Sequence, residues 1–149
     1  MANKGEVPDG EVVDQLGTAR VVREGSDATI AALALMVPRA LDAADQLADA
    51  GISVEVIDVR SLVPLDTRTI LESVSKTGRF FTVEENPRLC GWGAEIASIA
   101  ADEAFYDLDG PVIRITTPHI PLPAADNLED LALPNAERIV EKVSRAMNS

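Results

Sequence analysis

The 149-residue chain is poor in aromatic residues, at 3%, and contains one cysteine and one histidine. A single cysteine excludes an internal disulfide framework and is typical of a reducing compartment, so we expect a cytoplasmic protein. One histidine and one cysteine are too few for a zinc site of the usual kind. With few aromatic anchors, the apolar residues favour close packing of helices on a sheet.

Basic residues are also few, with 13 Lys and Arg against 25 Asp and Glu, which gives a formal net charge of -12. Such a surface repels phosphate groups, so we expect no nucleic-acid partner and no anionic membrane partner. There is no apolar run of about 18 residues and no signal-peptide core. The charge would attract a basic protein, and solubility alone is the alternative explanation.

Three common catalytic and nucleotide-binding motifs are missing. The sequence has no G-x-G-x-x-G after a strand pattern, no G-x-x-x-x-G-K-[ST] and no G-x-S-x-G. Dinucleotide binding through the first motif, phosphate-loop chemistry and serine hydrolysis are therefore not indicated.

The apolar pattern alternates between strand and helix periods along most of the chain. Residues 1–17 are rich in Gly, Pro and acids and predict a linker, and residues 18–149 predict one domain. The predicted strands cover 18–24, 28–35, 54–59, 79–83 and 112–116, and the predicted helices 38–50, 66–77, 91–106 and a last one from 134 or 135. A tight turn makes the first two strands antiparallel, and helical crossovers make the others parallel. The prediction is a three-layer α/β fold with a mixed five-stranded sheet, four strands parallel and one antiparallel at the edge, and helices on both faces.

Ligands of open α/β sheets bind at the carboxyl ends of the parallel strands. That edge is predicted to carry Arg60, Glu84, Glu85 and His119. His119 oriented by the glutamates would be a general base. The alternatives are a surface role for His119, and glutamates that cap a helix, pair with Arg60 or face solvent.

A second hypothesis concerns a small anion. Free amides at Gly93, near a helix start, together with Arg60 would hold a phosphate or nucleotide in a regulatory site. Glycine is equally required where a helix packs closely against a strand.

The segment 51–66 carries a resemblance to a known family, with the sequence GISVEVIDVRSLVPLD. It resembles the C-terminal domain of the transketolase-like family, as found in the beta subunit of thiamine-diphosphate-dependent 2-oxo acid dehydrogenases (pyruvate, branched-chain and acetoin types). Further matching blocks are LGTARVVREGSD at 16–27, SKTGR at 75–79, GWGAEI at 91–96, and PLP at 121–123 with the leucine and proline positions that follow. The sequence departs from the pattern at Leu33 and Ala34, where an aromatic-glycine pair is usual, and at Glu84, where a histidine is frequent.

The resemblance implies an assembly domain of an oxidoreductase, inactive alone. It implies that thiamine diphosphate and Mg²⁺ are bound by a preceding domain and the alpha subunit, so we expect no catalytic, cofactor-binding or metal residue here. The implied partners are the alpha subunit, a second beta subunit and the basic peripheral domain of dihydrolipoyl acyltransferase. We expect Asp126, Glu129 and Asp130 to contact that basic domain, and we expect the chain to be an excised domain or a split subunit.

Overall fold

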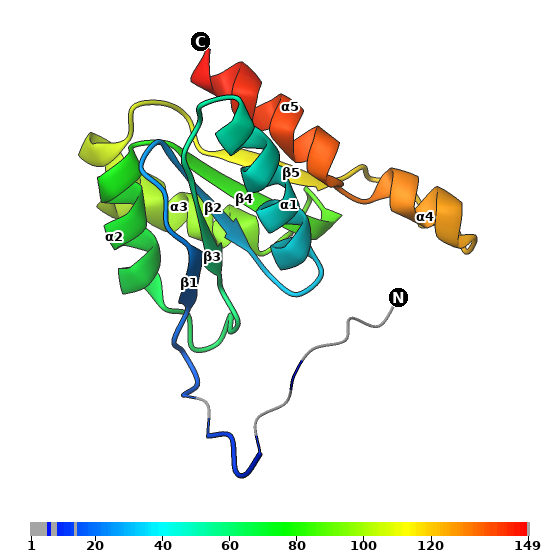
Figure 1. The fold of residues 1–149 in the computed structure, drawn as a ribbon, viewed down its shortest axis with the longest axis horizontal. Helices are drawn as coiled ribbons and strands as arrows, with labels where there is room; N and C mark the ends of the chain where they lie inside the picture. The colour runs from blue at the N-terminus through cyan, green and yellow to red at the C-terminus, as the bar shows by residue number, and fades with distance from the viewer. Residues whose placement is uncertain (1–5, 7–8, 14, 149) are drawn as a thin grey trace.

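The computed structural model describes residues 6, 9–13 and 15–148, and within them a five-stranded sheet lies between helices (Figure 1). The strand order is β1-β3-β2-β4-β5; β1 runs antiparallel to β3, and the other neighbours are parallel. This confirms the predicted mixed sheet with one antiparallel edge. The bounds are β1 (Arg20–Arg23), β2 (Ala28–Ala32), β3 (Val54–Asp58), β4 (Phe80–Pro87) and β5 (Ile113–Thr117).

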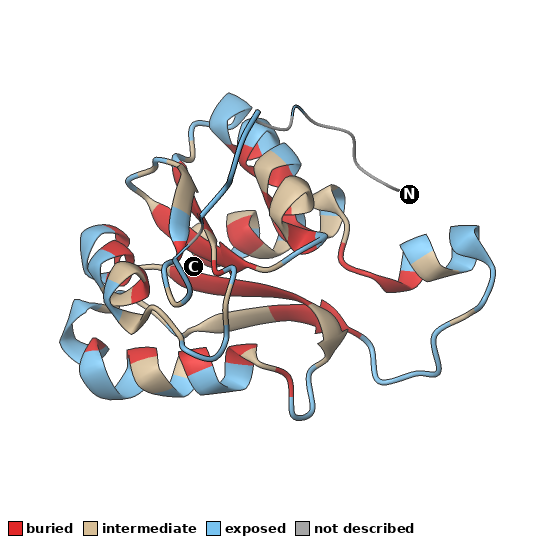
Figure 2. Cartoon of the chain, turned by 90° about the horizontal axis from the view of Figure 1, so that it is seen from below, coloured by how far each residue is buried: buried red, intermediate tan, exposed pale blue. Residues whose placement is uncertain are grey.

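The helices form the two outer layers. On one face α1 (Met36–Asp49) and α5 (Ala136–Met147) pack against the sheet, and on the other α2 (Thr67–Thr77) and α3 (Gly93–Glu103) do so. A single 3-10 turn, η1 (Phe105–Asp107), follows α3, and a short helix, α4 (Asp126–Ala132), precedes α5. Figure 2 shows the buried residues gathered on the sheet and on the helix faces turned toward it.

Alternation along the strands divides the core into two clusters. In β3, Val56 belongs to the cluster under α1 and α5, whereas Ile57 belongs to the cluster under α2 and α3. Phe81 and Phe80 of β4 divide in the same way, because successive side chains of a strand point to opposite faces. All five residues of β2 are buried, as expected for a central parallel strand.

The first two strands are antiparallel in direction but do not pair with each other, which the sequence did not predict. β3 lies between them, and the turn that follows β1 crosses the start of β3. The amides of Ser26 and Asp27 donate to the carbonyl of Ser53 at 3.2 and 2.8 Å. A Cβ at Gly25 would overlap the backbone between Val54 and Glu55. Glycine therefore permits this close crossing.

Helix boundaries follow the predicted signals closely. Asp66 caps α2 by accepting from the amide of Thr69 at 3.1 Å, and Gly78 ends α2 in the left-handed region. Gly51 follows α1 with a positive φ of 81°. However, α1 begins at Met36, two residues before the predicted start, and its buried face includes Ala40 and Ala43.

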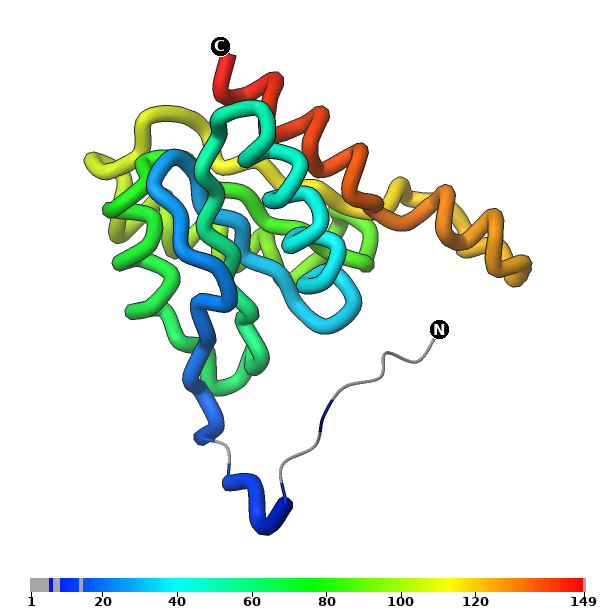
Figure 3. Tube along the Cα trace, in the orientation of Figure 1, coloured from blue at the N-terminus to red at the C-terminus, as the bar shows by residue number. Residues whose placement is uncertain are grey.

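Two segments outside the predicted helices and strands contain regular structure. β4 continues to Pro87, past the predicted end of that strand at residue 83. The proline-rich segment after β5 leads into α4, which extends from one end of the molecule (Figure 3). The predicted linker, 1–17, is partly outside the described residues; its described residues, 6, 9–13 and 15–17, contain no helix or strand, and the linker boundary stays a prediction.

Candidate functional site

The carboxyl edge of the sheet does not bring all the predicted residues together. Arg60 follows β3 and His119 follows β5, and β2 and β4 lie between those strands. Three strand spacings separate the two positions, on the order of 14 Å. His119 is exposed, and the amide of Arg60 donates to Asp58 Oδ1 at 3.1 Å. Arg60 and His119 therefore do not belong to one site. The other predicted residues of this edge lie in two regions that adjoin at β4, one around Glu84 and one that includes Glu85.

The first region is a buried network around Glu84 at the end of β4, whose side chain is 0% exposed. Arg114 of β5 donates from Nε to Oε1 at 2.8 Å and from Nη2 to Oε2 at 2.9 Å. Asn86 Nδ2 and the amide of Gly93 each donate to Oε2 at 3.0 Å. Thr82 Oγ1 donates to Oε1 at 3.1 Å. The carboxylate thus accepts five hydrogen bonds.

These donors outweigh the effect of burial on the pKa of Glu84. Burial alone raises that pKa, but Arg114, Asn86 and the Gly93 amide stabilise the charged form, and the pKa lies below its ordinary value. Glu84 is therefore a permanently ionised structural group at neutral pH. The Gly93 amide at the start of α3 donates to the Glu84 carboxylate. The anion hypothesis placed a ligand at this amide, so the contact counts against that hypothesis.

The glycines of the Gly91-Trp92-Gly93 block have a steric reason. A Cβ at Gly93 would overlap the Glu84 carboxylate, and a Cβ at Gly91 would overlap Asn86 and Glu84. The block lets the start of α3 approach the end of β4 until amide and carboxylate meet. Arg114, the principal partner of Glu84, was not singled out from the sequence. A lone arginine between the isoleucines of a buried strand was the available signal, because a buried charge requires a partner.

A second buried carboxylate, Glu55 of β3, was also missed. It is 2% exposed and accepts from Ser73 Oγ at 2.5 Å and from Lys76 Nζ. Burial raises the pKa of Glu55, but the bonds from Lys76 and Ser73 lower it below its ordinary value. This group joins α2 to the sheet and is far from the carboxyl edge.

The second region of that edge is an acidic groove of about 550 Å³ between the start of α1, the end of β4 and α4. Four of the predicted residues line it together: Glu85, Asp126, Glu129 and Asp130. Its one cation, Arg39 of α1, donates from Nη2 to Asp130 Oδ1 at 3.0 Å and from Nη1 to the carbonyl oxygen of Pro134 at 2.8 Å. Leu35, Pro38 and Leu133 supply its apolar surface.

The chemistry of this groove suits a cation. Four carboxylates surround one guanidinium that already has two acceptors, so the field in the groove is negative. Among the described residues, however, no group of three or more His, Cys, Asp and Glu side chains is placed to hold a metal ion. The described helices also include none that is long and apolar enough to cross a membrane.

Comparisons with known proteins agree with the fold. Residues 17–139 match the family described as "Transketolase, C-terminal domain". The pyruvate dehydrogenase E1 component subunit beta of Leifsonia xyli subsp. xyli is 46% identical over 144 residues, covering 97% of this chain and 42% of the relative. The beta subunit of acetoin:2,6-dichlorophenolindophenol oxidoreductase of Bacillus subtilis is 46% identical over 138 residues, covering 92% of this chain and 40% of the relative.

A solved structure is also similar. It is described as a split-gene transketolase, an inactive beta4 tetramer, and it has a TM-score of 0.80 and 30% identity over 97% of this chain and 46% of that one. The chain spans about two fifths of the length of the two curated relatives. The matched family and the observed topology agree over most of the sequence. The chain belongs to the transketolase C-terminal domain family.

Proposed function

We propose that this chain is the C-terminal assembly domain of the beta subunit in the decarboxylating component of a 2-oxo acid dehydrogenase. Its similarity to pyruvate and acetoin-type beta subunits supports this proposal. The similar structure described as a beta4 tetramer supports a role in subunit contacts. The parent enzyme is an oxidoreductase that uses thiamine diphosphate and Mg²⁺ held by other domains, with the alpha subunit and a second beta subunit as partners, in the cytoplasm.

The observation that carries the docking part of the proposal is the acidic groove. Its four carboxylates include the three for which we expected contact with a basic domain, and Glu85 adds a fourth from the end of β4. Opposite charges steer association and fix the register of the partner. The basic peripheral domain of dihydrolipoyl acyltransferase is the partner that this charge distribution fits.

Exposed apolar side chains on α4 and in the segment before it would supply binding energy that charge alone does not. Leu131 of α4 is 76% exposed and Leu128 is 49% exposed, and Ile120 and Leu122 of the preceding segment are also exposed. Exposed leucines surrounded by acids match the usual anatomy of an interface, in which apolar contacts lie within a polar rim. Because α4 projects at one end of the molecule, a small domain can reach it (Figure 1).

The test is a calorimetric titration of the 149-residue chain with the isolated peripheral domain at low ionic strength. We expect saturable binding that weakens as salt is added, since exposed charges are screened beyond about 10 Å at 0.1 M salt. If the partner docks in the acidic groove, an NMR titration should show chemical-shift changes in α4 and at Glu85. Absence of binding at low salt, or shifts confined to α2 and α3, would sink the docking proposal.

A further inference from the structure

A second pocket lies at the opposite end of the parallel strands from the acidic groove. Its volume is about 250 Å³, and it is formed by the starts of β4 and β5 and the last turns of α5. Arg79, the residue before β4, and Phe80, the first residue of β4, contribute to it. Pro111 contributes from the segment before β5, and Lys142 and Arg145 contribute from α5. We refer to it as the cationic pocket.

The charge of this pocket is opposite to that of the protein. The chain has 13 basic residues and a net charge of -12, yet among the described residues three cations and no carboxylate side chain line this one pocket. Lys142 and Arg145 are one turn apart on α5, and Arg138 precedes Lys142 by four residues. Glu141, four residues before Arg145 on the same helix, does not line the pocket.

Two of the cations have no acidic partner within the described residues. In the described part of the chain, neither Arg79 nor Lys142 forms an ion pair with an aspartate or glutamate. Both side chains are partly buried, so water solvates them less completely than it solvates an exposed lysine. The guanidinium of Arg79 lies against Gly110, where a Cβ would overlap it, so glycine leaves room for this placement.

The inner wall of the pocket is apolar. Phe81 and Ala146 belong to the core cluster under α1 and α5, Ile113 packs against that cluster, and Pro111 completes the wall. A hydrated inorganic ion would gain little from such a wall. An organic anion gains both contacts, because its apolar body covers the wall while its charged group reaches the cations.

We propose that the cationic pocket binds a small organic anion, an apolar body with one phosphate or carboxylate group. Arg79 and Lys142 bind the charged group with Arg145 beside them, and the wall formed by Phe81, Pro111 and Ile113 holds the body. The site is separate from the acidic groove and does not depend on the proposed docking function.

The test uses phenyl phosphate, with inorganic phosphate and phenol as the anionic and apolar halves of the same probe. Binding to the 149-residue chain is followed by amide chemical shifts. We expect saturable shifts at residues 79–81, 112–113 and 142–146, with inorganic phosphate and phenol each binding roughly tenfold more weakly. Benzoate in place of phenyl phosphate distinguishes a carboxylate ligand from a phosphate ligand.

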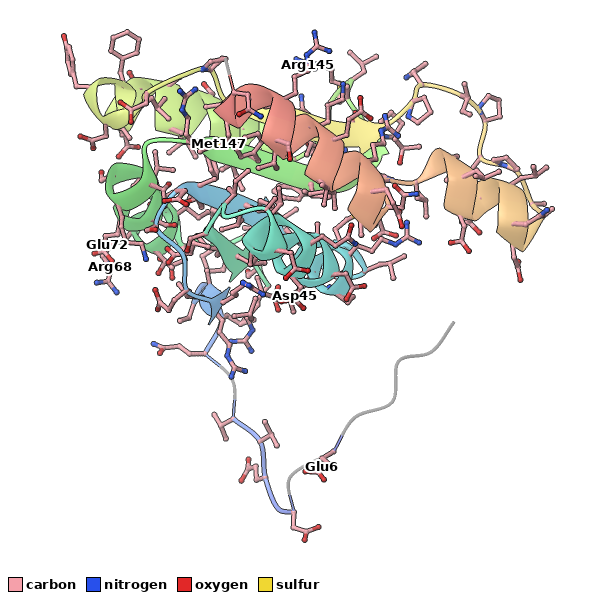
Figure 4. All side chains as sticks on the ribbon, turned by 45° about the horizontal axis from the view of Figure 1, so that its top comes forward. Glu6, Asp45, Arg68, Glu72, Arg145 and Met147 are labelled. Carbon is pink, nitrogen blue, oxygen red and sulfur yellow. The ribbon has the colours of Figure 1, made fainter. Side chains whose placement is uncertain are left out.

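Variants localise the effect. Arg79→Gln and Lys142→Gln should each raise the Kd for phenyl phosphate roughly tenfold. Arg68→Gln removes the same charge at a site well separated from Arg145 (Figure 4) and should leave the Kd unchanged. Since Lys142 lies on a helix surface, K142Q tests the site even if R79Q folds poorly.

Three results would overturn the proposal. Equal affinity for inorganic phosphate and phenyl phosphate would indicate an adventitious ion only. An equal loss in R68Q and K142Q would indicate general charge attraction. The third result is that a polyglutamate peptide binds at these residues while phenyl phosphate does not bind at 10 mM, a concentration on the order of the weakest specific affinities. That result would indicate a protein interface.

Discussion

Arg114 of β5 forms a bidentate ion pair with Glu84 of β4, and the same carboxylate accepts the amide of Gly93 at the start of α3. Both charged side chains are nearly excluded from water, at 10% and 0% exposed. One carboxylate therefore joins two strands and a helix at the carboxyl edge, beside the acidic groove to which Glu85 contributes. This buried pair fixes the end of β4 from which the groove is built.

The first prediction concerns this pair. Glu84→Gln should lower the free energy of unfolding by about 3–5 kcal/mol, because it leaves the Arg114 guanidinium buried without a counter-ion. Urea denaturation measures the loss. Glu85→Gln, at the next position and half-buried, should change stability by less than about 1 kcal/mol. Equal losses in the two variants would show that the pair has no special structural role.

The second prediction concerns acid. Burial raises the pKa values of Glu84, Glu55 and Asp66, but their hydrogen bonds leave each pKa below the ordinary values of 4.5, 4.5 and 3.8. The unfolded chain therefore binds more protons in this range, so stability present above pH 4.5 is lost as the pH falls through and below that value. Thermal unfolding between pH 7 and 3 measures this.

The Glu84→Gln variant provides the control for that experiment. This variant has no carboxyl group at position 84 to take up a proton on unfolding. The slope of its unfolding free energy against pH should therefore be smaller than that of the wild type, by at most about 1.4 kcal/mol per pH unit. If the Tm of the wild type rose as the pH was lowered from 5 to 3, this would contradict the assignment of lowered pKa values.

The third prediction concerns the Asp66 cap. Its Oδ1 accepts from the Thr69 amide at 3.1 Å, and its Oδ2 accepts from the Ala19 amide at 3.0 Å. Asp66→Ala should lower stability by about 1–2 kcal/mol, since one side chain serves the start of α2 and the approach to β1. Asp66→Asn should lose less, and Asp49→Ala at an exposed helix end should be nearly neutral. An Asp66→Ala variant as stable as the wild type would disprove the capping role.

The fourth prediction concerns Arg39, which connects α1 to Asp130 and to the Pro134 carbonyl. Arg39→Gln removes the ion pair that attaches α4 to the domain. Hydrogen exchange should become faster in residues 126–132, whereas global stability should change by less than about 1 kcal/mol because the pair is partly exposed. Exchange that accelerates equally in α2 would indicate global destabilisation instead.

The sequence predicted the fold well where local chemistry decides the structure. Asp66, Gly51 and Gly78 mark helix ends by capping and by positive φ, which depend on neighbours in sequence. The buried strands were recognisable from their apolar runs. The non-adjacency of β1 and β2 was not predictable from a short turn, because the insertion of β3 between them depends on a distant segment.

The candidate site was predictable in part for a similar reason. Glu85, Asp126, Glu129 and Asp130 were singled out, and they line one groove. The environment of Glu84 depends on Arg114, 30 residues further along the chain, so the polar residues after 83 gave no local sign that the strand continues. The cationic pocket was not predictable, because Arg79 and Lys142 approach each other only in the folded chain.

The fifth prediction tests the central claim, that the acidic groove is the docking surface for a basic domain. Asp126→Asn/Glu129→Gln removes two groove carboxylates and leaves Asp130 paired with Arg39. Asp102→Asn/Glu103→Gln removes two exposed carboxylates from α3 and serves as a control of equal net charge.

The most direct measurement is the Kd of each protein for the peripheral domain of dihydrolipoyl acyltransferase at low salt. We predict that the groove variant binds at least about fivefold more weakly than the wild type, while the α3 variant binds within about twofold of it. Equal weakening in both variants, or unchanged binding by the groove variant, would contradict the claim.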